Sequence, residues 1–74
     1  MIEKLTARES QILTLIAEGM SNKLIGQKLF ISESTVENHV HNIYRKLAIS
    51  NRAQATAYVF NEKMTVNNKV ERKI

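Results

Sequence analysis

Five polar side chains recur along one stretch in the middle of the chain, residues 31–47 (ISESTVENHVHNIYRKL). Their types are those that proteins use on DNA: glutamate accepts from cytosine N4, asparagine pairs with adenine, and histidine can donate to guanine or to a phosphate. Arginine near the end of the stretch can bind a phosphate oxygen. The five residues are Glu37, Asn38, His41, Asn42 and Arg45.

The same stretch predicts the helix that would hold these side chains together. Four apolar residues fall at i, i+4, i+7 and i+11, which places them on one face of a 3.6-residue helix, toward a core. Ser32 precedes them as an N-cap, since its hydroxyl can accept from the free amides of the first turn. The polar residues fall largely on the other face. The apolar four are Val36, Val40, Ile43 and Leu47.

Length and composition exclude several classes of function. Seventy-four residues make one small domain, and the net charge of +4 is compatible with a polyanionic partner. The chain has no Cys, no Asp and only two His, so we predict no disulfide, no metal site and no cofactor. It also lacks a phosphate-binding Gly loop and a credible pair of nucleophile and base. We therefore do not expect an enzyme.

The distribution of apolar residues predicts an all-α protein. Pro is absent, Gly occurs twice, and β-branched and aromatic residues do not alternate as they would in strands. No segment is apolar enough for a membrane span, and the N-terminus lacks the apolar region of a signal peptide. A cytoplasmic protein is the expectation.

Capping patterns predict two helices before residue 31. Thr6 and Glu9 fit a capping box that opens a helix over Ala7–Glu18, and Gly19 suits its left-handed end. Ser21 is the cap of a short second helix over Asn22–Leu29. Gly26 lies inside this helix, where we expect it to let another backbone come close.

A fourth helix is predicted after a linker at residues 48–50. Asn51 and Gln54 fit a second capping box, and the helix is expected to end between Asn61 and Met64. We therefore predict a domain over residues 1–64 and a flexible tail over 65–74, which carries two asparagines and mixed charges.

A short helix, a brief link and a longer helix with a polar face describe a helix-turn-helix. From Leu5 to Phe60 the chain resembles the LuxR/FixJ-type DNA-binding domain. The order and spacing of the matching segments make this resemblance specific. The segments are LTARE at 5–9, IAEG at 16–19, SNK at 21–23, ISESTV at 31–36, NHV at 38–40, KL at 46–47 and RAQA at 52–55.

The resemblance implies a four-helix fold, with the third helix in the major groove of double-stranded DNA and the fourth helix in a two-fold dimer. It also implies transcription regulation, with RNA polymerase as a further partner. The family's base-contacting positions correspond to Glu37, Asn38 and His41. Its backbone-contacting positions correspond to Lys23, Ser34, Thr35, Asn42, Arg45 and Lys46.

Two residues depart from the family's pattern. Many members have Lys or Arg at the position of Glu37, whose carboxylate repels phosphate, so Glu37 either reads a cytosine or turns away. Gly26 stands where the family usually has Ala, and it costs about 1 kcal/mol of helix propensity.

The fourth helix carries more apolar surface than one core contact needs. We expect the excess, which includes Ala57 and Tyr58, to form the dimer interface, and the sequence leaves open which of the two lies at its centre. An alternative function is a helical protein-interaction module that uses the same polar face on an acidic partner. The sequence leaves open whether the chain is a stand-alone member of the family or an excised domain.

Overall fold

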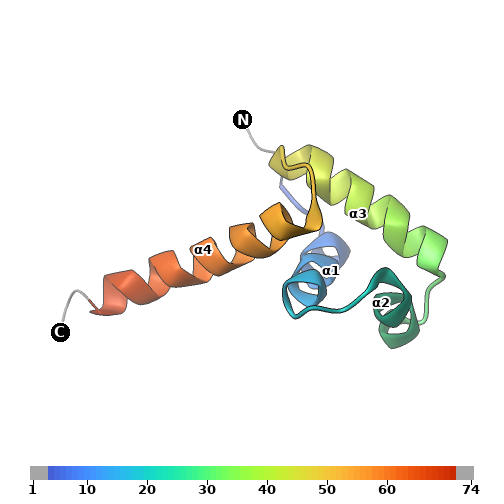
Figure 1. Ribbon diagram of the computed structural model, residues 1–74, viewed down its shortest axis with the longest axis horizontal. Helices are drawn as coiled ribbons and strands as arrows, with labels where there is room; N and C mark the ends of the chain where they lie inside the picture. Colours follow the sequence, from blue (N-terminus) through green and yellow to red (C-terminus); the bar gives the residue numbers. More distant parts are fainter. Residues whose placement is uncertain (1–3, 72–74) are drawn as a thin grey trace.

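The computed structural model describes residues 4–71, with side chains for residues 4–61, and within that range it is all-α (Figure 1). The prediction of four helices and no strands is confirmed for this part of the chain. The helix α1 lies at the centre and packs against each of the other three. The helices are α1 (Ala7–Ala17), α2 (Asn22–Leu29), α3 (Glu33–Leu47) and α4 (Arg52–Glu71).

The capping box at the start of α1 forms as predicted. The Glu9 amide donates to Thr6 Oγ1 at 3.1 Å, and the Thr6 amide donates to Glu9 Oε1 at 2.9 Å. The helix ends at Ala17, one residue earlier than expected, and Gly19 follows in the left-handed region with φ of 91°. Local signals therefore define both ends of α1.

The link between α2 and α3 turns without glycine. Phe30 ends α2 in the left-handed region, with φ of 61°, and Ser32 then caps α3 by accepting from the Thr35 amide at 3.1 Å. Gly26 makes this turn possible, because a Cβ at that position would lie 2.7 Å from the Ile31 carbonyl oxygen. The expectation of a close backbone at Gly26 is confirmed.

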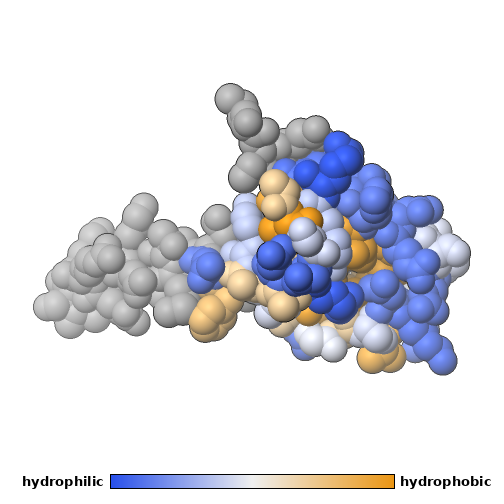
Figure 2. Space-filling model, turned by 45° about the horizontal axis from the view of Figure 1, so that its top comes forward, coloured by the Kyte–Doolittle hydropathy of each residue, from blue (hydrophilic) through white to orange (hydrophobic). Residues whose placement is uncertain are grey.

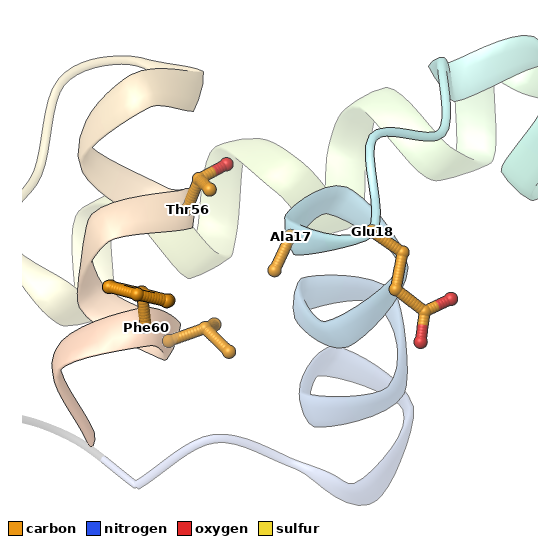
Figure 3. A pocket seen from close by; sticks show the side chains of 5 residues that line it. Ala17, Glu18, Thr56 and Phe60 are labelled. Carbon is orange, nitrogen blue, oxygen red and sulfur yellow. The ribbon is translucent and has the colours of Figure 1, made fainter. Parts of the chain in front are cut away.

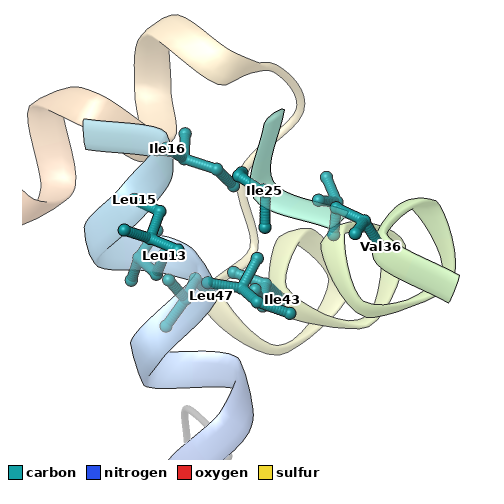
Figure 4. Packing of buried hydrophobic residues seen from close by; sticks show 10 residues of the cluster. Leu13, Leu15, Ile16, Ile25, Val36, Ile43 and Leu47 are labelled. Atoms are coloured by element: carbon teal, nitrogen blue, oxygen red, sulfur yellow. The ribbon is translucent and has the colours of Figure 1, made fainter. Parts of the chain in front are cut away.

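A single hydrophobic core joins the helices. Side chains of α1, α2 and α3 meet in Figure 4, and Ala55 of α4 is fully buried beside them. All four apolar residues predicted for the inner face of α3 are buried. The core consists of Ile12, Leu13, Leu15, Ile16, Ile25, Val36, Val40, Ile43, Leu47 and Ala55.

The second capping box is only partly as predicted. The Gln54 amide donates to Asn51 Oδ1 at 2.9 Å, which confirms Asn51 as the cap. The Gln54 side chain, however, accepts from the Ser50 amide at 2.6 Å instead of from Asn51. The return bond thus reaches one residue further back and stabilises the linker as well as the helix.

The helix α4 is longer than predicted. An end between Asn61 and Met64 was expected, but the helix continues to Glu71. No Gly or Pro interrupts this range, and an Asn costs a helix only a fraction of a kcal/mol, so the two asparagines at 67–68 do not end the helix. The division into a domain at 1–64 and a flexible tail at 65–74 stays a prediction. Despite this length, none of the helices within the described residues is apolar enough to cross a membrane.

Candidate nucleic-acid interface

The helix α3 presents two opposed faces. Its core face is formed by the four buried residues named above, which fix how the helix is rotated about its axis. On the opposite side Ser34, Asn38, His41 and Arg45 follow one another at i, i+4, i+7 and i+11, and all four are exposed. Hydrophilic residues cover much of the side of the molecule where α3 lies (Figure 2).

The three predicted base-contacting residues lie together on this outer side. Asn38 and His41 are one turn apart, and Glu37 lies beside Asn38 on the flank of the same surface. All three are exposed, and none makes a hydrogen bond or ion pair with another described residue. Their donors and acceptors are therefore available to a ligand.

The first turn of α3 offers hydroxyl groups beside this row. Ser34 is exposed, whereas Thr35 is half-buried and its Oγ1 lies 2.9 Å from Ser32 Oγ. The Thr35 amide is already used by the Ser32 cap. Of the two hydroxyls predicted to contact the DNA backbone, that of Ser34 is the more accessible.

The remaining predicted phosphate contacts differ in their surroundings. Lys23, the second residue of α2, is exposed, as is Arg45 on the row of α3. Asn42 is half-buried on the flank of α3.

Lys46 has a partner that sequence reasoning missed. Its Nζ donates to Glu9 Oε1 at 2.8 Å, and only 14% of the Lys46 side chain is exposed. This bond from Lys46, together with the hydrogen bonds from Thr6, holds the pKa of the Glu9 carboxyl below its ordinary value of 4.5, although burial opposes the shift. Glu9 was interpreted as a capping residue alone, but it also joins α1 to the end of α3. A signal for this partner was present in the sequence, because helical spacing places the carboxylate of Glu9 on the core-facing side of α1, beside its apolar residues.

The apolar residues of α4 divide into a buried and an exposed set. Ala53, Ala57 and Phe60 fall at i, i+4 and i+7 and are exposed, Phe60 by 60%. Tyr58 is half-buried and packs against the core. Of the two residues predicted for the dimer interface, Ala57 lies on the outer stripe and Tyr58 on the inner flank.

A small pocket separates the end of α1 from α4 (Figure 3). Its volume is about 100 Å³, well below the several hundred Å³ of a typical cofactor or drug-sized site. Thr56 and Phe60 of α4 face Ala17 of α1 across it, whereas the carboxylate of Glu18, which also lines the pocket, points away from α4. We assign no ligand to this pocket.

Comparison with known proteins identifies the family. Residues 3–59 match the model of the bacterial regulatory proteins of the luxR family. The chain is 55% identical over 56 residues to the transcriptional regulatory protein LiaR of Bacillus subtilis, a match that covers 76% of this chain and 26% of LiaR. It is 41% identical over 63 residues to the nitrate/nitrite response regulator protein NarL of Escherichia coli, covering 85% of this chain and 29% of NarL.

Solved structures agree with the sequence matches. The response regulator ChrA of a heme-sensing two-component system superimposes with a TM-score of 0.76 at 41% identity, over 82% of this chain and 30% of ChrA. The chain thus spans between a quarter and a third of the length of these relatives. The family is one of regulators and not a class of enzymes. This chain belongs to the luxR family of bacterial regulatory proteins, and it is a helix-turn-helix domain of the kind that binds DNA in the transcription regulators of that family.

Proposed function

We propose that α3 lies in the major groove of double-stranded DNA and reads base edges with Glu37, Asn38 and His41. The observation that carries this proposal is the opposition of the two faces of α3: the core face is buried, and on the outer side Glu37, Asn38 and His41 are exposed and make no hydrogen bond or ion pair with another described residue. The major groove admits an α-helix and presents a distinct pattern for each base pair. Asn38 matches adenine, and Glu37 matches the amino group of cytosine.

Phosphate contacts would flank the base-reading residues. Lys23 and Arg45 supply exposed cations, and Ser34, Thr35 and Asn42 supply uncharged polar groups near them. Such contacts fix the register of a protein on the duplex without reading its sequence. We leave Lys46 out of this set, because its ammonium is engaged by Glu9 and is largely buried.

Selection of bound duplexes from a random library is the direct test. Sequence-specific binding predicts that a defined motif emerges, and that affinity for it falls steeply with salt because phosphate binding releases counterions. Asn38→Ala should change the selected base at one position of that motif. Asn61→Ala, the same change at an exposed site of α4, should leave the motif unaltered. A library that shows no enrichment would instead favour a protein-interaction module.

We also propose that two copies bind one site through the stripe Ala53, Ala57 and Phe60. Two-fold pairing doubles the length of the recognised site and makes it palindromic. Ala57→Glu would place a charge at the centre of the stripe and should reduce binding from two protomers per duplex to one. Gln11→Glu adds the same charge on the exposed side of α1 and should preserve two protomers. Contact with RNA polymerase and a cytoplasmic location stay predictions, and we assign no residue to the polymerase.

A further inference from the structure

Arg52, the first residue of α4, reaches across the domain to the start of α2. Its Nη1 donates to Asn22 Oδ1 at 3.0 Å, and its Nη2 donates to the backbone carbonyl of Met20. These partners lie 30 and 32 positions earlier in the chain. A planar guanidinium can hold two acceptors in a fixed orientation, which the single ammonium of a lysine cannot do.

The two acceptors belong to the part of the domain that would bind DNA. Met20 lies in the link between α1 and α2, and Asn22 is the first residue of α2, directly before Lys23. Burial raises the pKa of the Tyr44 hydroxyl on α3, and the positive charge of Arg52 opposes the rise. Arg52 thus links the start of α4 to the start of α2, which packs against α3.

The position of this link bears on how a dimer would fit the duplex. In a two-fold dimer through α4, the two copies of α3 must lie about one helical turn of DNA apart, or a multiple of it, to enter successive stretches of major groove. That separation depends on the angle between α4 and the pair α2–α3. In such a dimer each copy of α3 would lie at a distance from the two-fold axis. A small rotation of the α2–α3 pair about the start of α4 would therefore move α3 by a larger distance in the groove.

We propose that Arg52 is a positioning residue that fixes the α2–α3 pair relative to α4 and thereby sets the spacing between two half-sites. The inference rests on the proposed dimer through α4. It concerns a side chain that touches neither the outer face of α3 nor the exposed stripe of α4. Its effect should therefore appear in spacing preference and not in recognition of one half-site.

The test compares Arg52→Lys with Arg8→Lys in the intact chain. Both changes keep the net charge, and Arg8 is exposed on α1 without a bond to the described residues. Binding is measured to a duplex with one half-site and to duplexes with two half-sites whose separation varies by single base pairs. Thermal unfolding of each variant is recorded alongside.

Arg52→Lys should bind one half-site like the parent and lose about fivefold or more of the gain from a second half-site at the preferred spacing, a typical coupling between sites. Its preference among spacings should also flatten. Asn22→Ala removes one acceptor of Arg52 and leaves the other, the Met20 carbonyl. It should therefore lose less of the gain from a second half-site than Arg52→Lys does. Arg8→Lys should match the parent throughout.

Two results would contradict the proposed role of Arg52 and leave the proposed dimer standing. One is a parent-like gain and spacing preference in Arg52→Lys. The other is an equal loss on one and two half-sites together with a lower unfolding temperature, which would indicate a structural role only. A parent that gains nothing from a second half-site at any spacing would contradict the dimer itself, and the role of Arg52 with it.

Discussion

The ammonium of Lys46 lies 2.8 Å from Glu9 Oε1 and joins the last turn of α3 to the first turn of α1. Glu9 is itself almost fully buried and accepts from the Thr6 amide with the same oxygen atom. A buried pair is costly to break on one side, because the remaining charge loses its partner away from water. The pair therefore fixes the last turn of α3 against the first turn of α1.

The ion pair predicts a loss of stability in acid. The native state lowers the pKa of the Glu9 carboxyl below 4.5, so its contribution is complete above that pH and disappears as the pH falls through the native pKa. Glu9→Gln should lower the free energy of unfolding by about 3 kcal/mol at pH 7, the lower end for a buried pair. Denaturant unfolding at pH 7 and at pH 3 should show this difference shrink. Glu18→Gln, on an exposed residue at the opposite end of the same helix, should change little at either pH. An unchanged difference in acid would contradict the pairing.

Val40 tests the core face of α3. Its side chain is buried, and Val40→Ala removes two methyl groups at a cost of about 1–3 kcal/mol from the narrow margin of a small domain. Thermal unfolding should shift downward accordingly. The binding motif of the fraction that remains folded should not change. A variant with parent-like stability would mean that the rotation of α3 is misassigned.

The helices and the two faces of α3 could be predicted because their signals are local. Val36 and Val40 are one turn apart, and Ser32 caps the amide three residues ahead. The partners of Lys46 and Arg52 could not be predicted in this way, since each lies 30 or more positions away and depends on how the helices cross. Local rules also gave Phe30 no special role, although it takes a left-handed conformation that such rules reserve for glycine.

Gly26 predicts an unusual response to alanine. Helix propensity alone would favour Gly26→Ala by about 1 kcal/mol. The added Cβ, however, would lie 2.7 Å from the Ile31 carbonyl oxygen, so the turn between α2 and α3 would have to open. We expect a net loss of about 1 kcal/mol in the free energy of unfolding, since overpacking outweighs propensity. Gln27→Ala at the exposed neighbouring site should be near neutral. A gain in stability at Gly26 would show that the turn adapts without cost.

Replacing Glu37 by lysine is predicted to tighten DNA binding, not to weaken it. Its carboxylate opposes phosphate, so Glu37→Lys should tighten binding to any duplex and steepen the salt dependence by about one phosphate contact. If Glu37 reads a cytosine, preference for the native site should fall at the same time. Glu18→Lys makes the same charge change at the end of α1 and away from α3. Equal effects of the two substitutions would mean that Glu37 makes no specific contact with DNA.

The central claim is that the outer face of α3 recognises DNA and does not support the fold. The most direct measurement is the affinity of Asn38→Ala for the selected duplex and for its single-base variants, with thermal unfolding of the same protein. Asn38→Ala should leave the unfolding temperature unchanged and lose about 1–3 kcal/mol of discrimination at one base pair, the value of a bidentate contact. Undiminished discrimination at every base pair, or an unfolding temperature lowered as much as by Val40→Ala, would contradict the claim.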